Sequence, residues 1–376
     1  MRQEPNVQVG VGMSPALERI QSEYVQLRGS ASFSLRDLFQ PDNFRFEDYC
    51  REFSPHPESE ALRKIVEEFG RSHGIWLPNA KHHVTCALFL YPEAGFGRML
   101  TMMKNLILGF YLNDTMGRDT FQYLSPAQKV SARRMILRMA RLDDTLSIPA
   151  NADPLERVNA GILREFRDHS PAAWFAHFMQ IYCYHIGITH TDGNTEAQGH
   201  VPEIDEYMER RCHLGGVHHI LHWIEFSDGG FLDWSWLATI GAAQSLKRLH
   251  WVTAAFAGMS NDLFSFEKEV IDNDSDSNLI MIIALNRPGL SLEEVIDRAA
   301  KIVRHLLLDV LALMSALEKK ITDHETASPK QTGRLAVHLA GVRRCVQAIW
   351  TWHCHSGRYK REDSIWAETT LAEAHA

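Results

Sequence analysis

The sequence lacks the features of secreted and membrane-spanning proteins. Its 376 residues include only six cysteines, and none of them forms a C-x-x-C pair, so the thiols are predicted to stay reduced, as is usual in the cytoplasm. The longest apolar runs, such as 279–285, are far shorter than the roughly 18 residues that a membrane-spanning helix needs. The first residues, Met1 to Pro5, do not have the apolar core of a signal peptide. These observations predict a cytoplasmic protein with no membrane span.

The charge balance and the short motifs exclude further classes. The 47 acidic residues outnumber the 39 lysines and arginines, for a net charge of −8, whereas binding nucleic acid calls for a basic surface. The chain has no P-loop, no G-x-G-x-x-G and no G-x-S-x-G motif. His218 and His222 have the spacing of a zinc-binding helix, but His219 stands where H-E-x-x-H requires glutamate. We therefore interpret these histidines as ordinary helix residues.

The sequence does contain a row of oxygen-bearing side chains on one predicted helix. Asn261, Ser265 and Glu269 are spaced i, i+4, i+8, and because each step of four residues turns only about 40° around a helix, they share one face. Amide, hydroxyl and carboxylate oxygens suit Mg²⁺, which commonly binds through few protein groups plus substrate phosphates. The alternative is a solvent-exposed polar face. The apolar run 251–259 argues against it, because a polar triplet that leaves a buried helix is costly unless it is paired or coordinated.

Residues 261–269 resemble the Asn-Ser-Glu magnesium motif of class I terpene synthases, Asn/Asp-Asp-x-x-Ser-x-x-Lys/Arg-Glu/Asp, at every defining position. The resemblance implies that Asn261, Ser265 and Glu269 bind Mg²⁺, and three ions are the usual number in that family. It also implies that Lys268 adds positive charge toward the substrate diphosphate.

The same family carries an aspartate-rich motif after an apolar, aromatic-rich helix, and residues 105–119 resemble it. Asn113 and Asp114 stand where the family has two adjacent aspartates, so the resemblance implies Asp114 as a metal ligand and Asn113 as a weaker, neutral one. Asp119 is a third candidate, but it follows Asp114 by five residues, about 140° around a regular helix. Direct coordination is one alternative for Asp119; binding through water and pairing with an arginine are the others.

Two shorter segments extend the resemblance. It implies Arg211 as the arginine that senses diphosphate, with Arg210 as the alternative. It also implies Gly215 as the family's effector residue, a small residue that follows this arginine where the Gly-Gly pair 215–216 interrupts the helix. Near the C-terminus it implies Arg358 and Tyr359 as the pair that hydrogen-bonds the diphosphate when the site closes.

Helical periodicity predominates outside these motifs. One long helix is predicted to begin with a capping box of Ser291 and Glu294. The sequence therefore predicts an all-α, single-domain protein of about ten to twelve helices, and the resemblance implies that they form a bundle around a central apolar cavity. One domain is expected to span 1–376, with a peripheral N-terminal segment 1–30 and a C-terminal tail 365–376.

The resemblance implies a Mg²⁺-dependent terpene cyclase that ionises a linear isoprenyl diphosphate, cyclises the carbocation and releases diphosphate. Farnesyl diphosphate is favoured over geranylgeranyl diphosphate by its frequency in the family, and the sequence leaves open whether the product is an alkene or an alcohol. Aromatic faces stabilise cations by roughly 0.5–2 kcal/mol each, and the candidates to line the cavity are Phe89, Phe110, Trp223, Phe226 and Trp352.

Other functions stay open at this point. One is a chain-elongating prenyltransferase on the same fold, although that family uses a second aspartate-rich motif where this chain has Asn, Ser and Glu. Another is a helical binding protein that has lost catalysis. Many members of the terpene synthase family are dimers, and the sequence leaves open whether this chain forms a homodimer.

Overall fold

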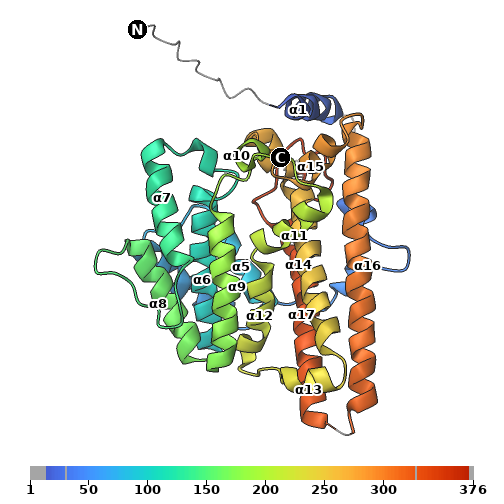
Figure 1. Ribbon diagram of the computed structural model, residues 1–376. Helices are drawn as coiled ribbons and strands as arrows, with labels where there is room; N and C mark the ends of the chain where they lie inside the picture. Colours follow the sequence, from blue (N-terminus) through green and yellow to red (C-terminus); the bar gives the residue numbers. More distant parts are fainter. Residues whose placement is uncertain (1–13, 30–31, 327, 372–376) are drawn as a thin grey trace.

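The computed structural model describes residues 14–29, 32–326 and 328–371, and over these residues the protein is all-helical (Figure 1). β-Pairing there is limited to two isolated bridges, Phe33–Trp366 and Arg361–Thr370, which confirms the predicted all-α class. The first elements are α1 (Pro15–Leu27), α2 (Leu35–Phe39), α3 (Phe46–Tyr49), α4 (Ser59–Ser72), α5 (Ala80–Leu90), α6 (Phe96–Met116), the 3₁₀ turn η1 (Phe121–Tyr123), α7 (Pro126–Met139), α8 (Pro154–Asp168) and α9 (Ala172–Thr189). The remaining elements are α10 (Thr195–Gln198), α11 (Ile204–Leu214), α12 (Val217–Asp228), α13 (Trp234–Thr239), α14 (Ala243–Phe266), the π-helical segment η2 (Glu267–Asp272), α15 (Leu279–Asn286), α16 (Leu292–His324) and α17 (Pro329–His355).

The number of helices is larger than predicted. The described residues form seventeen α-helices rather than ten to twelve. Four of them, α2, α3, α10 and α13, are only four to six residues long. Such helices have fewer than two turns, so no apolar periodicity can reveal them in the sequence.

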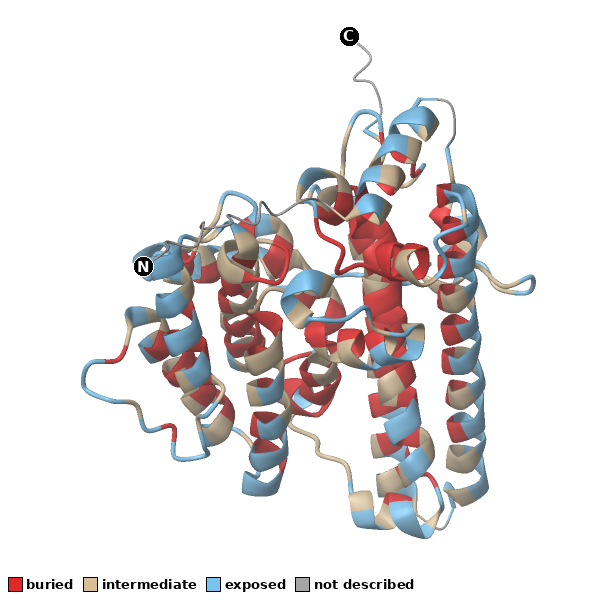
Figure 2. Ribbon diagram, turned by 45° about the horizontal axis from the view of Figure 1, so that its top comes forward, coloured by how far each residue is buried: buried red, intermediate tan, exposed pale blue. Residues whose placement is uncertain are grey.

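Helix α14 occupies the centre of the bundle, between α11, α12, α16 and α17 (Figures 1 and 2). Every residue in 252–260 is buried, and none of them is charged. Gly258 lies against α11, where an added Cβ would come 3.3 Å from the backbone oxygen of Arg211. The missing side chain thus allows the backbones of α11 and α14 to approach closely.

Helix α16 covers one side of α14 and is buried on the face toward it (Figure 2). It begins with the predicted capping box: the Ser291 Oγ accepts from the Glu294 N–H, and the Glu294 carboxylate accepts from the Ser291 N–H. In the described part of the chain, no helix is both long enough and apolar enough to span a membrane.

The terminal segments are less peripheral than predicted. In α1, three side chains, including Tyr24, are buried, and within the expected tail 365–376 Ile365 and Trp366 are fully buried. The carboxylate of Glu267 ties both ends to the bundle, because it accepts from the Tyr24 hydroxyl at 2.8 Å and from the Ile365 N–H at 3.0 Å. The rest of the two predicted segments, 1–13, 30 and 372–376, lies outside the described residues.

Helix α12 contains a carboxylate, Glu225, that makes stability depend on pH. Its side chain is 1% exposed, one oxygen accepts from the Leu232 N–H and the other has no partner among the described residues. Burial raises the pKa of Glu225 to about 7, although the Leu232 N–H and Arg334 oppose the shift. Because the folded state holds this proton at a pH where the unfolded state has lost it, the free energy of unfolding should fall as pH rises from about 4.5 to 7.

We expect Glu225→Gln, which keeps an acceptor for Leu232 and removes the charge, to stabilise the protein by about 3 kcal/mol at pH 8 and by roughly half of that at pH 5.5. Urea denaturation at both values measures the difference, and Glu196→Gln on exposed α10 is the control. A stabilisation that does not change with pH would mean that Glu225 is not the titrating group.

Candidate active site

A cavity of about 220 Å³ lies inside the bundle, bordered by α5, α6, α9, α11, α12, α14 and α17. Segments far apart in the sequence meet around it. The predicted site residues that line it are Phe110, Asn113, Arg211, Gly215, Asn261, Lys268, Glu269, Trp352, Arg358 and Tyr359.

Three of the five predicted cavity aromatics lie elsewhere. Phe89 stacks on Phe53 with ring centroids 4.8 Å apart, and Trp223 and Phe226 pack against Phe166 at 5.4 and 4.6 Å. None of these side chains lines the cavity. An aromatic on the apolar side of a helix can face either the core or the cavity, and periodicity does not distinguish the two.

The predicted oxygen row is present, but its helix is not regular. Asn261 and Ser265 lie in α14, whereas Glu269 lies in the π-helical segment η2. The sequence-based expectation of one regular helix was therefore wrong for the last member. Short π-helical segments often occur at functional sites, and this one sets the direction of the Glu269 carboxylate.

The three members of the row have different partners. The Asn261 carbonyl oxygen accepts from Arg211 Nη2 at 2.7 Å, and its amide donates to the Tyr359 hydroxyl at 2.9 Å. Glu269 accepts from the side-chain amide of Asn278 at 3.0 Å and from the guanidinium of Arg118. The Ser265 hydroxyl is buried and has no hydrogen-bond partner among the described residues.

This donor set fits Mg²⁺. The row offers an amide oxygen, a hydroxyl oxygen and a carboxylate, which are hard ligands of the type that Mg²⁺ prefers. A buried hydroxyl without a partner is costly, and the Ser265 Oγ would gain one by coordinating a cation. Asn261, Ser265 and Glu269 are thus the residues that would hold the metal on this side of the cavity.

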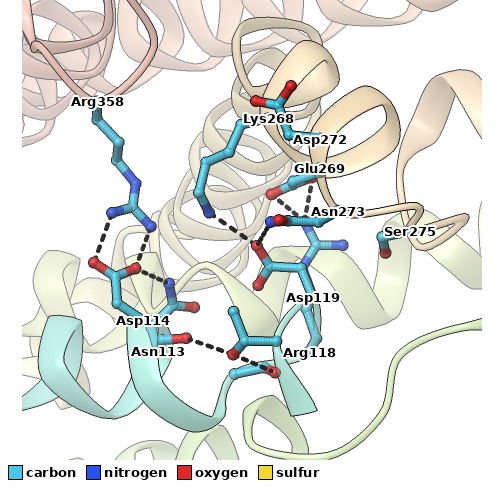
Figure 3. A network of polar contacts seen from close by, with 12 residues as sticks. Asn113, Asp114, Arg118, Asp119, Lys268, Glu269, Asp272, Asn273, Ser275 and Arg358 are labelled. Atoms are coloured by element: carbon cyan, nitrogen blue, oxygen red, sulfur yellow. Dashed lines mark hydrogen bonds and ion pairs between the residues drawn. The ribbon is translucent and has the colours of Figure 1, made fainter. Parts of the chain in front are cut away.

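The opposite side of the cavity mouth is formed by the end of α6 (Figure 3). Arg358 donates to both oxygens of Asp114, at 2.8 and 2.6 Å, and Asn113 donates to the same carboxylate at 3.1 Å. Burial works against ionisation of Asp114, but the hydrogen bonds from Arg358 lower its pKa below the usual value. Asp114 is therefore a carboxylate at neutral pH and carries the charge that a metal ligand needs.

The asparagine at position 113 gives a direct test of this side. We expect Asn113→Asp to preserve or raise turnover and to lower the Mg²⁺ concentration for half-maximal rate by a factor of about 2 to 10, because a second carboxylate strengthens divalent-ion binding. Steady-state rates across a Mg²⁺ titration measure this, with Asn194→Asp, away from the cavity, as the control. Complete inactivation by Asn113→Asp would mean that this segment is not the aspartate-rich motif.

Among the described residues, Asp119 pairs with a lysine and not with an arginine, which was one of the predicted alternatives. Its carboxylate accepts from Lys268 Nζ at 2.8 Å and from Asn273 at 3.3 Å (Figure 3). Helix α6 ends at Met116, so the angle expected from a regular helix does not apply to Asp119. Burial opposes its ionisation, but Lys268 and Arg118 hold the pKa of Asp119 at about 2.

The residue that sequence reasoning missed is Arg118. Its Nη2 lies 2.9 Å from both oxygens of Glu269 and 3.5 Å from Asp262, and its Nη1 donates to Ser277 (Figure 3). The side chain is buried and reaches from the end of α6 to η2. Arg118 therefore joins the two sides of the cavity mouth. Its position between Asp114 and Asp119 is the only sequence signal that pointed to it.

Each carboxylate of the mouth thus faces a cation (Figure 3): Arg358 pairs with Asp114, Lys268 with Asp119, and Arg118 with Glu269. Such buried pairs cost desolvation energy. The pairing brings together anionic oxygens of the type that could hold a metal ion and cations that could hold a polyanion.

The two arginines on α11 face different surroundings. Arg211 lines the cavity and donates to Asn261 and to Asp262, both at 2.7 Å. Arg210 donates to Gln198 at 2.6 Å and lines a separate pocket. Of the two alternatives, the geometry favours Arg211 as the residue that meets a ligand in the cavity. Gly215 ends α11 four residues later and also lines the cavity.

One group of soft ligands lies outside the oxygen-lined mouth. Ligand atoms of Cys212, His213 and His218 come within 4.8 Å of one another. His222, the other member of the i, i+4 pair, instead stacks on Trp174 with ring centroids 4.5 Å apart. Nitrogen and sulfur ligands do not suit Mg²⁺, so this group is not part of the oxygen site.

Known proteins support the assignment of the site to a family. The family model described as "Terpene synthase family 2, C-terminal metal binding" matches residues 104–309, more than half of the chain. The chain is 25% identical over 281 residues to (2Z,6E)-hedycaryol synthase of Kitasatospora setae, covering 73% of this chain and 78% of that protein. It is 25% identical over 225 residues to epi-isozizaene synthase of Streptomyces coelicolor, covering 58% and 57%.

Solved structures show the same fold. Hedycaryol synthase in complex with HEPES superposes with a TM-score of 0.64 and 19% identity, covering 84% of this chain and 98% of that one. Linalool/nerolidol synthase from Streptomyces clavuligerus in complex with 2-fluorogeranyl diphosphate gives 0.65 and 15%, covering 80% and 96%. With the match of the family model, these results establish that the chain belongs to the terpene synthase family and is a class I terpene synthase of the microbial type.

Proposed function

We propose that the protein is a Mg²⁺-dependent terpene cyclase that ionises farnesyl diphosphate and cyclises the resulting carbocation. The observation that carries the proposal is that one cavity is lined by Asn113, the neighbour of Asp114, and by Asn261 and Glu269, two members of the oxygen row. Bound Mg²⁺ would neutralise charge on the diphosphate and favour its departure.

The cations at the mouth bind the leaving group. Arg211, Lys268, Arg358 and the Tyr359 hydroxyl all line the cavity and carry hydrogen-bond donors. Their partners include Asp114, Asp119 and Asn261, residues that would bind metal. With those oxygens bound to metal, the donors of Arg211, Lys268 and Arg358 would be free for the diphosphate and would stabilise the negative charge that develops as the C–O bond breaks.

The cavity then controls the carbocation. The allylic C–O bond breaks with its electron pair going to the diphosphate, so an apolar, water-poor space must hold the cation. Phe110 and Trp352 line that space, and their ring faces attract a cation without acting as bases. The Gly215 backbone, at the helix break beside the cavity, offers a dipole for the nascent cation.

The choice of farnesyl diphosphate is supported by relatives. The chain is 23% identical over 274 residues to a 7-epi-alpha-eudesmol synthase whose name states that it cyclises (2E,6E)-farnesyl diphosphate, and 24% identical to the sesquiterpene cyclase hepA of Aspergillus oryzae. Geranylgeranyl diphosphate is the alternative substrate.

Incubation with Mg²⁺ and, separately, geranyl, farnesyl and geranylgeranyl diphosphates tests the proposal, with the extracts separated by gas chromatography–mass spectrometry. We expect a cyclic product from farnesyl diphosphate that disappears with EDTA. Linear alcohols alone, at the level found without enzyme, would contradict it. A longer prenyl diphosphate formed when isopentenyl diphosphate is added would identify a prenyltransferase instead.

A further inference from the structure

Three histidines line the cavity beside the break between α11 and α12. His185 lies on α9, His190 directly follows α9, and His219 lies on α12. The ring centroid of His185 is 5.0 Å from that of His219 and 6.5 Å from that of His190. A cavity meant for a carbocation needs apolar walls, so three imidazoles in one part of it require a reason.

Their free nitrogens are the informative feature. Both ring nitrogens of His190 and Nδ1 of His219 are buried and have no hydrogen-bond partner among the described residues. Each such group is costly if it stays unpaired. Buried polar atoms of this kind are commonly satisfied by ordered water, which makes two to four hydrogen bonds.

The tautomer of His185 follows from its partners. Its Nδ1 lies 3.0 Å from the backbone oxygen of His213, and because a carbonyl only accepts, Nδ1 carries the proton. The Thr189 hydroxyl donates to the His185 carbonyl at 2.7 Å and can accept from the same Nδ1. The Nε2 atom therefore bears the lone pair that can accept a proton.

All three rings are neutral near pH 7. Burial lowers the pKa of His185 to about 4 and that of His190 to about 3, and it holds the pKa of His219 well below its usual value. A neutral imidazole offers one donor and one acceptor. The three rings together can hold a water molecule from several sides.

Gly216 provides the space for this arrangement. Its backbone is in the left-handed region, with φ of 69°, and an added Cβ would lie 2.8 Å from Cε1 of His219 and 3.4 Å from Cε1 of His185. No larger residue fits there without displacing the rings.

We propose that His185, His190 and His219 hold a water molecule in the cavity, and that this water ends the reaction by adding to the carbocation, so that the product is an alcohol. The inference rests on the proposed function. An oxygen lone pair of the water forms the C–O bond to the cationic carbon. The O–H bond of the resulting oxonium ion breaks, and its proton passes to the Nε2 lone pair of His185. The imidazolium later gives the proton to solvent, and the enzyme returns to its starting state.

Direct deprotonation to an alkene is the competing outcome. One imidazole would suffice for it, whereas three buried ring nitrogens without partners in the described residues, two on His190 and one on His219, favour a held water molecule.

The test uses the full-length enzyme with Mg²⁺ and farnesyl diphosphate in water enriched in ¹⁸O. We expect a cyclic alcohol whose oxygen carries the enrichment of the solvent. In His185→Leu, the ratio of alcohol to hydrocarbon should fall about tenfold or more, since a positioned base usually contributes at least that much. The control His177→Gln, exposed on the same helix, should give the wild-type ratio.

A second variant distinguishes loss of the held water from loss of the fold. His190→Leu removes two nitrogens that lack protein partners, so it is expected to fold, as far-UV circular dichroism and thermal unfolding would report, and to lower the same ratio. A wild-type product without solvent oxygen, or an unchanged ratio in both variants, would overturn the inference and leave the cyclase assignment intact. Absence of any cyclic product from the wild-type enzyme would instead overturn the proposed function, and with it this inference.

Discussion

Replacement of Asn261 by alanine is expected to lower turnover of farnesyl diphosphate by about 10² to 10³-fold, the usual cost of losing one group that stabilises charge in the transition state. The fold should persist, because Arg211 keeps its second partner, Asp262, at 2.7 Å after Asn261 is lost. Thermal unfolding and circular dichroism check the fold, and product formation at saturating Mg²⁺ measures the rate.

The matching change at Glu269 has to be chosen with care. Glu269→Ala would leave the buried guanidinium of Arg118 with Ser277 and the more distant carboxylate of Asp262, at 3.5 Å, and an unpaired buried charge costs about 3–5 kcal/mol. Glu269→Gln keeps an acceptor for Arg118 and still removes the charge that a metal needs.

The control for both is Gln244→Ala, which removes an exposed amide from α14, the helix that carries Asn261. Wild-type-like turnover in the double variant Asn261→Ala/Glu269→Gln would contradict the assignment of the oxygen row as the metal site.

Replacement of Arg118 by methionine is expected to have the largest effect on stability. The change removes both hydrogen bonds to Glu269 and leaves its carboxylate and that of Asp262 buried with less compensation. We expect a loss of about 3–5 kcal/mol, seen as a fall in Tm of roughly 4–6 °C. The exposed Arg298→Met on α16 should change the Tm by about 1 °C or less.

Two further measurements connect this effect to the ion pair. The double variant Arg118→Met/Glu269→Gln should be more stable than the sum of the single changes predicts, since the two residues are in contact. Addition of Mg²⁺ with inorganic diphosphate should raise the Tm of Arg118→Met by more than that of the wild type, because the cation can replace the arginine at Glu269. If Arg118→Met melts at the wild-type temperature, the ion pair does not support the fold.

Features that depend on local sequence were predictable. Three features each depend on residues within about ten positions of one another. They are the spacing of Asn261, Ser265 and Glu269, the end of an apolar helix at Asp114, and the capping box at Ser291. Hydrogen-bonding and periodicity rules act at that range, and the structure brings most of the predicted site residues to one cavity.

Features that depend on the partners of a side chain were not predictable. Arg118 meets Glu269 across 151 positions of the sequence, and Lys268 meets Asp119 across 149. The π-helical register at Glu269 is set by backbone hydrogen bonds that an apolar pattern does not specify. The direction of Trp223 was not predictable either. Its side chain faces the core rather than the cavity because the helices that pack around it decide that direction.

The measurement that tests the central claim most directly is a crystal structure of the wild-type protein with Mn²⁺ and inorganic diphosphate. The anomalous signal of Mn²⁺ locates the ions without reference to the expected ligands. We predict peaks beside Asn261, Ser265 and Glu269 and beside Asp114, with diphosphate held between them by Arg211 and Arg358. Peaks only at other positions, such as the Cys212–His213–His218 group, with no diphosphate at the cavity mouth, would contradict the account.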